Sequence, residues 1–152
     1  MNRDLGIIIT HINNSVWFDN IFLELKNMIK DDPYRHICVF NSYSEKLITH
    51  NVPILHLNQS KFFTGDVIVF DILSLNLIRS FPLLTNKYYY AQDVPWGSNL
   101  GAYAEWGSLL EQNKLEIIAK NQEIYDLYEI CWKKPLGIME NFQYERLSQI
   151  VR

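Results

Sequence analysis

The chain has 152 residues, of which 48% are hydrophobic and 20% charged, a composition that excludes a disordered polypeptide and fits one globular domain. Its formal net charge of -3 gives no general attraction to nucleic acid or to an anionic membrane surface, so neither is an expected partner. No apolar run approaches the roughly 18 residues that a membrane span requires, and we expect a cytoplasmic protein.

Short apolar runs, each ended by a polar residue, recur along the chain. Such runs are typical of strands that are buried on both faces of a parallel sheet covered by helices. We expect strands, in chain order, at residues 5–10, 36–40, 53–57, 66–70, 88–92, 115–120 and 136–139. The third of them is expected at an edge of the sheet, because Pro53 has no amide hydrogen to donate to a neighbouring strand.

Helical patterns separate most of these strands. The first helix can be capped by Asn14 or Ser15, and Asp31, Asp32 and Pro33 end it. Its apolar residues recur at three- and four-residue spacing and are Phe18, Ile21, Phe22, Leu25, Met28 and Ile29. We also expect a helical turn at residues 44–49, helices at 72–81, 122–133 and 144–151, and a loop at the start of residues 93–107.

Strands that alternate with helices at this spacing predict an α/β fold. We expect one Rossmann-like, doubly wound domain over residues 1–152, with a mainly parallel sheet of about six to seven strands flanked by helices. The first six strands are expected in the spatial order 3-2-1-4-5-6. No repeat, low-complexity tract or linker divides the sequence.

The turn after the first expected strand, from Thr10 to Ser15, contains no glycine. This excludes both the Gly-rich dinucleotide fingerprint and the P-loop. The helix that follows still offers free amides to an anion, so Thr10, Asn13, Asn14 and Ser15 are candidate ligand-binding residues, although Asn14 and Ser15 can simply cap the helix. His11 is a candidate catalytic base or phosphate ligand, with a structural role as the alternative.

Asp71 and Asp93 follow the fourth and fifth expected strands. Because neighbouring strand ends place such carboxylates roughly 5–10 Å apart, both are candidate catalytic residues for acid–base chemistry. Asp71 can instead cap the next helix, whereas Asp93 precedes a proline-containing loop where a cap is less obviously required. Gln92, Asn41 and Asn121 are candidate ligand-binding residues, with turn or cap roles as the alternative for the two asparagines.

Trp96, Tyr103 and Trp106 cluster around the loop that follows Asp93. Exposed aromatic faces stack on sugar rings or bases, but the same residues can close a core beneath a loop. Trp96 is the candidate ligand-binding residue of this group, and core packing is the alternative.

No cofactor and no metal site are expected. The histidines His36, His50 and His56 show no metal-ligand spacing with one another or with cysteine. Cys38 and Cys131 lie far apart in the sequence, and we expect two buried free thiols in a reducing compartment, with a disulfide between them as the alternative.

Two parts of the sequence resemble the N-terminal domain of GT-B-fold glycosyltransferases. Residues 88–96, Tyr-Tyr-Tyr-Ala-Gln-Asp-Val-Pro-Trp, are similar to the aromatic-rich strand and acidic turn of that domain. Residues 117–121, Ile-Ile-Ala-Lys-Asn, and residues 135–142, Pro-Leu-Gly-Ile-Met-Glu-Asn-Phe, look like its sixth strand and exit, particularly in glycosyltransferase-like proteins of large tailed phages. The resemblance covers the chain from residue 88 onward, and the first half only in the order of its elements.

In that family the N-terminal domain mainly binds the acceptor, and a C-terminal domain holds the nucleotide-sugar donor. The resemblance implies an acceptor-binding half that acts with a separately encoded partner or is a non-catalytic remnant, in the host cytoplasm if the chain is phage-encoded. An active form would hold an acceptor hydroxyl near His11, Asp71 and Asp93, with one of them as general base. The alternatives are a protein-interaction or homodimer module using the aromatic surface around Trp96 and Trp106, and a small nucleotide-binding protein.

Overall fold

The computed structural model of the chain describes residues 4–12, 15–32, 36–44, 52–75, 86–97, 99–112 and 114–151. Within these residues, seven parallel strands form one sheet in the spatial order β5-β3-β1-β6-β7-β8-β9. In chain order they are β1 (Leu5–Ile8), β3 (Ile37–Asn41), β5 (Ile54–His56), β6 (Asp66–Val69), β7 (Lys87–Ala91), β8 (Glu116–Ala119) and β9 (Gly137–Ile138). This is the predicted Rossmann-like, doubly wound α/β fold, and the predicted order of the first six expected strands is confirmed.

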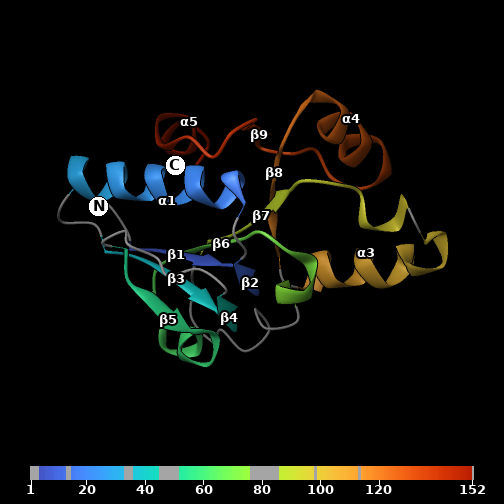
Figure 1. Ribbon diagram of the computed structural model, residues 1–152. Coiled ribbons are helices and arrows are strands. Elements are labelled where there is room, and N and C mark those ends of the chain that lie inside the picture. Colours follow the sequence, from blue (N-terminus) through green and yellow to red (C-terminus); the bar gives the residue numbers. More distant parts are fainter. Residues whose placement is uncertain are drawn as a thin grey trace.

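Helices flank this sheet on both sides (Figure 1). The helices α1 (Val16–Asp31) and α5 (Tyr144–Ile150) pack together over one face, whereas α3 (Tyr103–Gln112) and α4 (Gln122–Cys131) contribute to the core on the other. Four short 3₁₀ helices within the described residues are η1 (Leu57–Phe62), η2 (Ile72–Ser74), η3 (Pro95–Gly97) and η4 (Leu100–Ala102). No described helix combines the length and the apolar character needed to cross a lipid bilayer.

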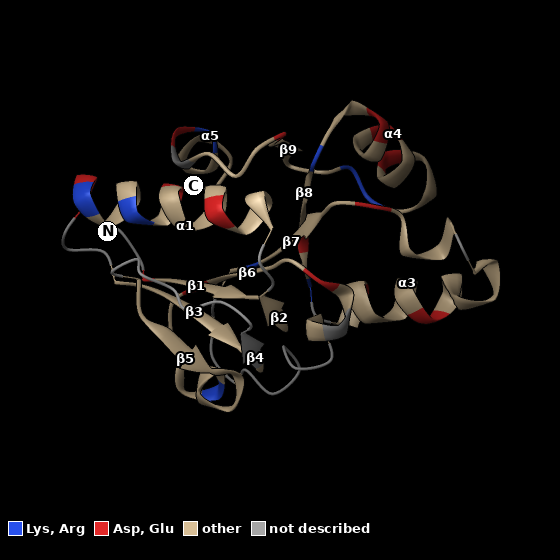
Figure 2. Cartoon of the chain, in the orientation of Figure 1, with Lys and Arg blue, Asp and Glu red and all other residues tan. Residues whose placement is uncertain are grey.

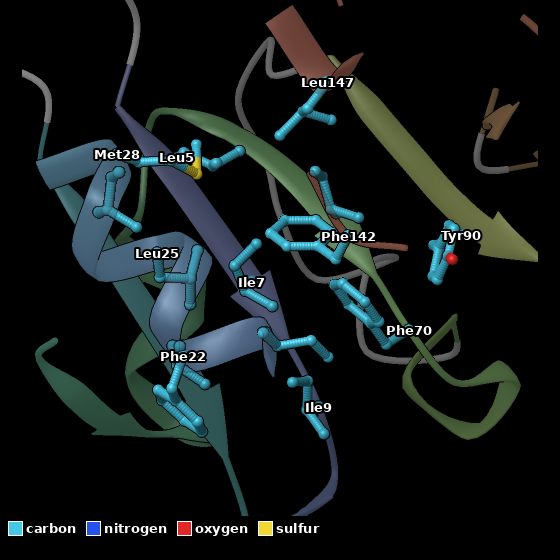
Figure 3. Close-up of a cluster of buried hydrophobic side chains, with 14 of the residues drawn as sticks. Leu5, Ile7, Ile9, Phe22, Leu25, Met28, Phe70, Tyr90, Phe142 and Leu147 are labelled. Atoms are coloured by element: carbon cyan, nitrogen blue, oxygen red, sulfur yellow. The ribbon is translucent and has the colours of Figure 1, made fainter. Parts of the chain in front are cut away.

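The buried strands divide the core into two clusters, because successive side chains of a strand point to opposite faces of the sheet. In β1, Ile7 belongs to the cluster under α1 and Ile8 to the cluster on the opposite face. The α1 stripe fills the first cluster, where Phe22, Leu25 and Met28 pack against the sheet (Figure 3). Full burial of a side chain of this size contributes about 1.5–3 kcal/mol, so the predicted stripe is what fixes α1 to the sheet.

Some element boundaries differ from the sequence-based expectations. Ser44 belongs to β4 (Tyr43–Ser44), which pairs with β2 (His11–Ile12), so a helical turn at this residue is wrong; residues 45–49 lie outside the described residues. The Thr10 carbonyl oxygen favours this ladder, because it accepts hydrogen bonds from the Ser42 amide at 3.2 Å and the Ser42 hydroxyl at 2.6 Å.

The helices also differ in extent from the predictions. Of the helix expected at residues 72–81, only residues 72–75 are described, and they contain η2. The loop expected from residue 93 winds into η3 and η4 and then continues as α3, a helix that the sequence did not predict. Gly97, Gly101 and Gly107 mask its pattern, because glycine is a poor helix former and suggests a loop.

Both edges of the sheet are formed by short strands. β5 forms one edge, as Pro53 predicts, and at the other edge Arg146 Nε donates to the Ile138 carbonyl oxygen at 3.0 Å. The arginine thereby occupies an acceptor that a further strand could use.

Both cysteines are free thiols. Cys38 is buried and Cys131 half-buried, and burial raises the pKa of the Cys38 thiol to about 12.

Candidate functional site

The turns that follow β6 and β7 enclose a cavity of about 670 Å³ at the carboxyl ends of these strands. We call it the strand-end cavity, and it is lined by Phe70, Asp71, Ile72, Tyr89, Gln92, Asp93, Val94, Pro95, Gly97 and Trp106. Figure 1 shows both turns leaving the sheet on the side of α3. Open parallel sheets bind their ligands at this end of the strands, so the cavity lies where a functional site is expected.

Asp71 holds the turn after β6 together. Its Oδ1 accepts a hydrogen bond from the Ser74 amide at 2.9 Å, and its Oδ2 accepts from the Ser74 hydroxyl at 2.8 Å and from the Thr10 amide at 2.9 Å. The carboxylate caps η2 and links the end of β1 to the end of β6. The cap that was the alternative for Asp71 is therefore confirmed, and a catalytic role of this residue stays a prediction.

Gln92 and Asp93 form the turn after β7. The Gln92 Nε2 donates to the Phe70 carbonyl oxygen at 3.2 Å, which joins the two turns and leaves the amide oxygen of Gln92 as an acceptor. Asp93 is exposed, and none of the described residues donates a hydrogen bond to its carboxylate. The two predicted strand-end aspartates line one cavity but differ completely in the hydrogen bonds that they accept.

Tyr89 and Tyr128 place two hydroxyl groups beside Asp93. Tyr89 is buried in β7 and lines the cavity, and Tyr128 of α4 is buried next to it, with 6.5 Å between the ring centroids. The Tyr128 hydroxyl donates a long hydrogen bond of 3.4 Å to the Asp93 carbonyl oxygen. Burial raises the pKa of both phenols, and the negative charges of Asp93 and Asp71 raise the pKa of Tyr89 further. Both hydroxyls therefore keep their protons at neutral pH.

The two tryptophans of this region occupy different environments. Trp96 is only 5% exposed, and its ring packs edge-on against Tyr103 at 5.4 Å and Tyr128 at 5.1 Å, measured between centroids. It closes the core beneath the loop, so the core alternative is confirmed, and a ligand-binding role of Trp96 stays a prediction. Trp106 of α3 is half-buried and lines the strand-end cavity.

The turn after β1 stands apart from the cavity lining. His11 is exposed in β2, where it is paired with Tyr43, and it is not among the described lining residues. Thr10 is linked to the cavity only through the bond from its amide to Asp71. Ser15 occupies the cap position of α1 without forming a side-chain capping bond. Asn13 and Asn14 lie outside the described residues.

The two asparagines predicted as ligand-binding residues lie away from this lining. The Asn121 Oδ1 accepts a hydrogen bond from the Ile124 amide at 2.9 Å, which makes it the cap of α4. Asn41 ends β3 and is buried, and its amide nitrogen has no hydrogen-bond partner among the described residues. The turn or cap alternative for Asn41 is therefore wrong, because this residue is the buried last residue of β3.

Sequence reasoning missed Tyr89 as a site residue and named Trp106 only within the aromatic cluster that follows Asp93. Tyr89 lies within a run of three tyrosines that predicts strand packing, but alternation along β7 separates it from its neighbours. Tyr88 and Tyr90 face the cluster under α1, whereas Tyr89 faces the opposite cluster. That alternation is the signal that could have placed its side chain near Asp93.

The strand-end cavity is acidic and rich in hydrogen-bond acceptors. Its described lining contains two carboxylates, one carboxamide and three aromatic residues, and no lysine, arginine or histidine. In Figure 2 the chain is red just beyond the ends of β6 and β7. Such a surface suits hydroxyl or amine donors and disfavours a phosphate, which needs cationic or amide donors. Among the described residues, no group of three or more histidine, cysteine or acidic side chains could hold a metal ion.

A second cavity, of about 440 Å³, lies at the opposite end of β8. Lys133 and Glu116 in its wall form an ion pair with 2.8 Å between Nζ and Oε1, and the Lys133 ammonium also donates to the Leu115 carbonyl oxygen at 3.3 Å. The ion pair thus neutralises the Lys133 and Glu116 charges, which makes this cavity the weaker candidate.

The chain matches no known family model, no curated protein and no solved structure.

Proposed function

We propose that the strand-end cavity binds a polyhydroxylated ligand of the sugar class, with Asp93 as the main polar contact. The supporting observation is the exposed Asp93 carboxylate, which accepts no hydrogen bond from any described residue, beside the acceptor oxygen of Gln92 and the indole of Trp106. Carboxylate and amide oxygens accept hydrogen bonds from sugar hydroxyls, and an aromatic face packs on the apolar face of a sugar ring.

In the glycosyltransferase-like interpretation, this ligand is the acceptor of a sugar-transfer reaction. Asp93 then removes the proton of the acceptor hydroxyl, and a partner protein supplies the donor site. A non-catalytic form would bind the same ligand without turnover. Asp71 is the weaker candidate for the base, because three hydrogen bonds already hold its carboxylate.

The two alternative functions have less support. A nucleotide would bring phosphates to a cavity whose described lining carries two carboxylates and no cationic side chain. An interaction module built on Trp96 lacks its central residue, since that ring is buried in the core. Trp106 remains accessible, but it lines the cavity rather than a flat surface.

Calorimetric titration with a panel of neutral mono- and disaccharides, and with a nucleotide sugar, tests the proposal. We expect at least one neutral sugar to bind, and Asp93→Ala to weaken it about tenfold, as the loss of a charged hydrogen bond of about 1.5 kcal/mol predicts. Glu145→Ala, an exposed carboxylate on α5, is the matched control and should leave the affinity unchanged. Binding of the nucleotide sugar alone, or equal affinity in Asp93→Ala, would contradict the proposal.

A further inference from the structure

We propose that the strand-end cavity selects ligands that carry an amino group, so that an amino sugar binds more tightly than its neutral counterpart. This inference rests on the proposed function, since it names the chemical class of ligand for the same cavity. It follows from the balance of hydrogen-bond donors and acceptors in the lining and from the absence of a compensating cation among the described lining residues.

The lining offers acceptors in excess of donors. One N–H of the Gln92 amide is engaged at the Phe70 carbonyl oxygen, and the Gln92 amide oxygen is left for a ligand. The Tyr89 side chain is only 2% exposed. The Asp93 carboxylate has only acceptor oxygens, so a ligand rich in donors is the better complement. An ammonium group brings three donors, whereas a hydroxyl brings one.

The charges of the lining residues also favour a ligand with an ammonium group. Ion pairs among the described residues include those of His36 with Asp4, Lys133 with Glu116 and Lys134 with Glu129. Asp71 and Asp93 take part in none of them, so two negative charges face the cavity without a cationic partner among the described residues. An ammonium group would supply that partner.

The negative charges of the lining affect the Tyr89 phenol, and the aromatic lining of the cavity suits a cation. The negative charges of Asp93 and Asp71 both act on the Tyr89 phenol, whose pKa is raised mainly by burial and further by these charges. Trp106, which is half-buried, also lines the cavity. Aromatic faces attract cations through their quadrupole, an effect that adds to the attraction of the carboxylates.

The test compares glucose with glucosamine in calorimetric titrations at about pH 6, where amines are protonated. At low salt we expect glucosamine to bind about fivefold more tightly, the upper end for a partly exposed ion pair. The preference should shrink at about 1 M salt, where the Debye length is about 3 Å. N-acetylglucosamine, which has a similar shape but no charge, should lose the preference.

Variants separate the charge from the shape of the site. Asp93→Asn keeps the side-chain shape and removes the charge, so the ratio of the two affinities should fall toward one. Glu145→Gln, on α5, is the control and should keep the ratio. Equal binding of both sugars would overturn the inference and leave the proposed function standing. Absence of binding by both sugars and by ethanolamine would overturn both, whereas binding of ethanolamine without either sugar would support the charge preference and contradict the proposed function.

Discussion

The turns after β6 and β7 share a sequence feature, but their aspartates differ in the hydrogen bonds that they accept. Each follows a buried strand, each carries an aspartate just beyond it, and both aspartates line the strand-end cavity. Asp71 accepts three hydrogen bonds, from Ser74 and Thr10. Asp93 is exposed and accepts none at its carboxylate from the described residues.

The residues that follow each aspartate explain the difference. Asp71 stands at the cap position of η2, and Ser74, three residues later, presents the amide and hydroxyl that satisfy it. After Asp93, Pro95 occupies the first position of η3, a place that proline favours, so the cap position moves to Val94. A strand-end aspartate is thus a structural cap or an open acceptor according to where the next helix begins.

The largest expected effect is on stability. Asp71→Ala should lower the free energy of unfolding by about 2–3 kcal/mol, because it removes a cap and leaves the Thr10 amide without its partner. Asp93→Ala should change it by less than about 0.5 kcal/mol, as for a typical exposed position. Urea unfolding of both variants measures the contrast, and equal losses would remove the distinction between the two turns.

Alkaline pH should lower the stability of the chain through the buried tyrosines of β7, the strand that precedes Asp93. Burial raises the pKa of Tyr90 to about 12, whereas an unfolded tyrosine titrates near pH 10. The unfolded chain therefore releases its proton first as the pH rises. The stabilising contribution is complete below about pH 10 and should be lost, on the order of 2 kcal/mol, by about pH 12.

Urea midpoints measured across this pH window check the alkaline prediction. Tyr128→Phe removes one of the other buried phenols whose pKa is raised, so its stability should fall less steeply with pH than that of the unchanged chain. A stability that stays constant up to about pH 12 would show that these phenols ionise as readily in the folded chain.

A smaller effect should distinguish a helix cap that forms a side-chain hydrogen bond from a cap residue that forms none. The Asn121 side chain accepts the Ile124 amide, whereas Ser15 stands at the start of α1 without a side-chain bond. Asn121→Ala should cost about 1 kcal/mol, and Ser15→Ala less than about 0.5 kcal/mol. Thermal unfolding measures both, and a larger loss for Ser15→Ala would reverse the assignment.

Much of the fold could be predicted from the sequence because buried parallel strands and amphipathic helices have strong local patterns. The apolar run of Val67 to Phe70 and the spacing of Phe22, Leu25 and Met28 are such patterns, and both elements form. The ladder between β2 and β4 was missed, because two-residue strands have no detectable period. α3 was missed because Gly107 lies within it.

The candidate site was less predictable, because contacts between distant segments decide it. The sequence located Asp71, Gln92 and Asp93 at strand ends, and they do line one cavity. It could not show that Ser74 and Thr10 engage Asp71, or that Trp96 turns inward to pack on Tyr128. The burial of Asn41 was equally hidden, since a polar residue after an apolar run normally suggests a surface turn.

The account rests on binding at the turn after β7, and an NMR titration of the isotope-labelled chain with glucosamine and glucose tests this most directly. We expect the largest shifts at the amides of Gln92, Asp93 and Gly97 and at the indole of Trp106, all in the strand-end cavity. The same titration of Asp93→Ala should show smaller shifts at the same ligand concentration. Shifts confined to Trp132 and Lys133, in the cavity at the opposite end of β8, or no shifts at all, would contradict the account.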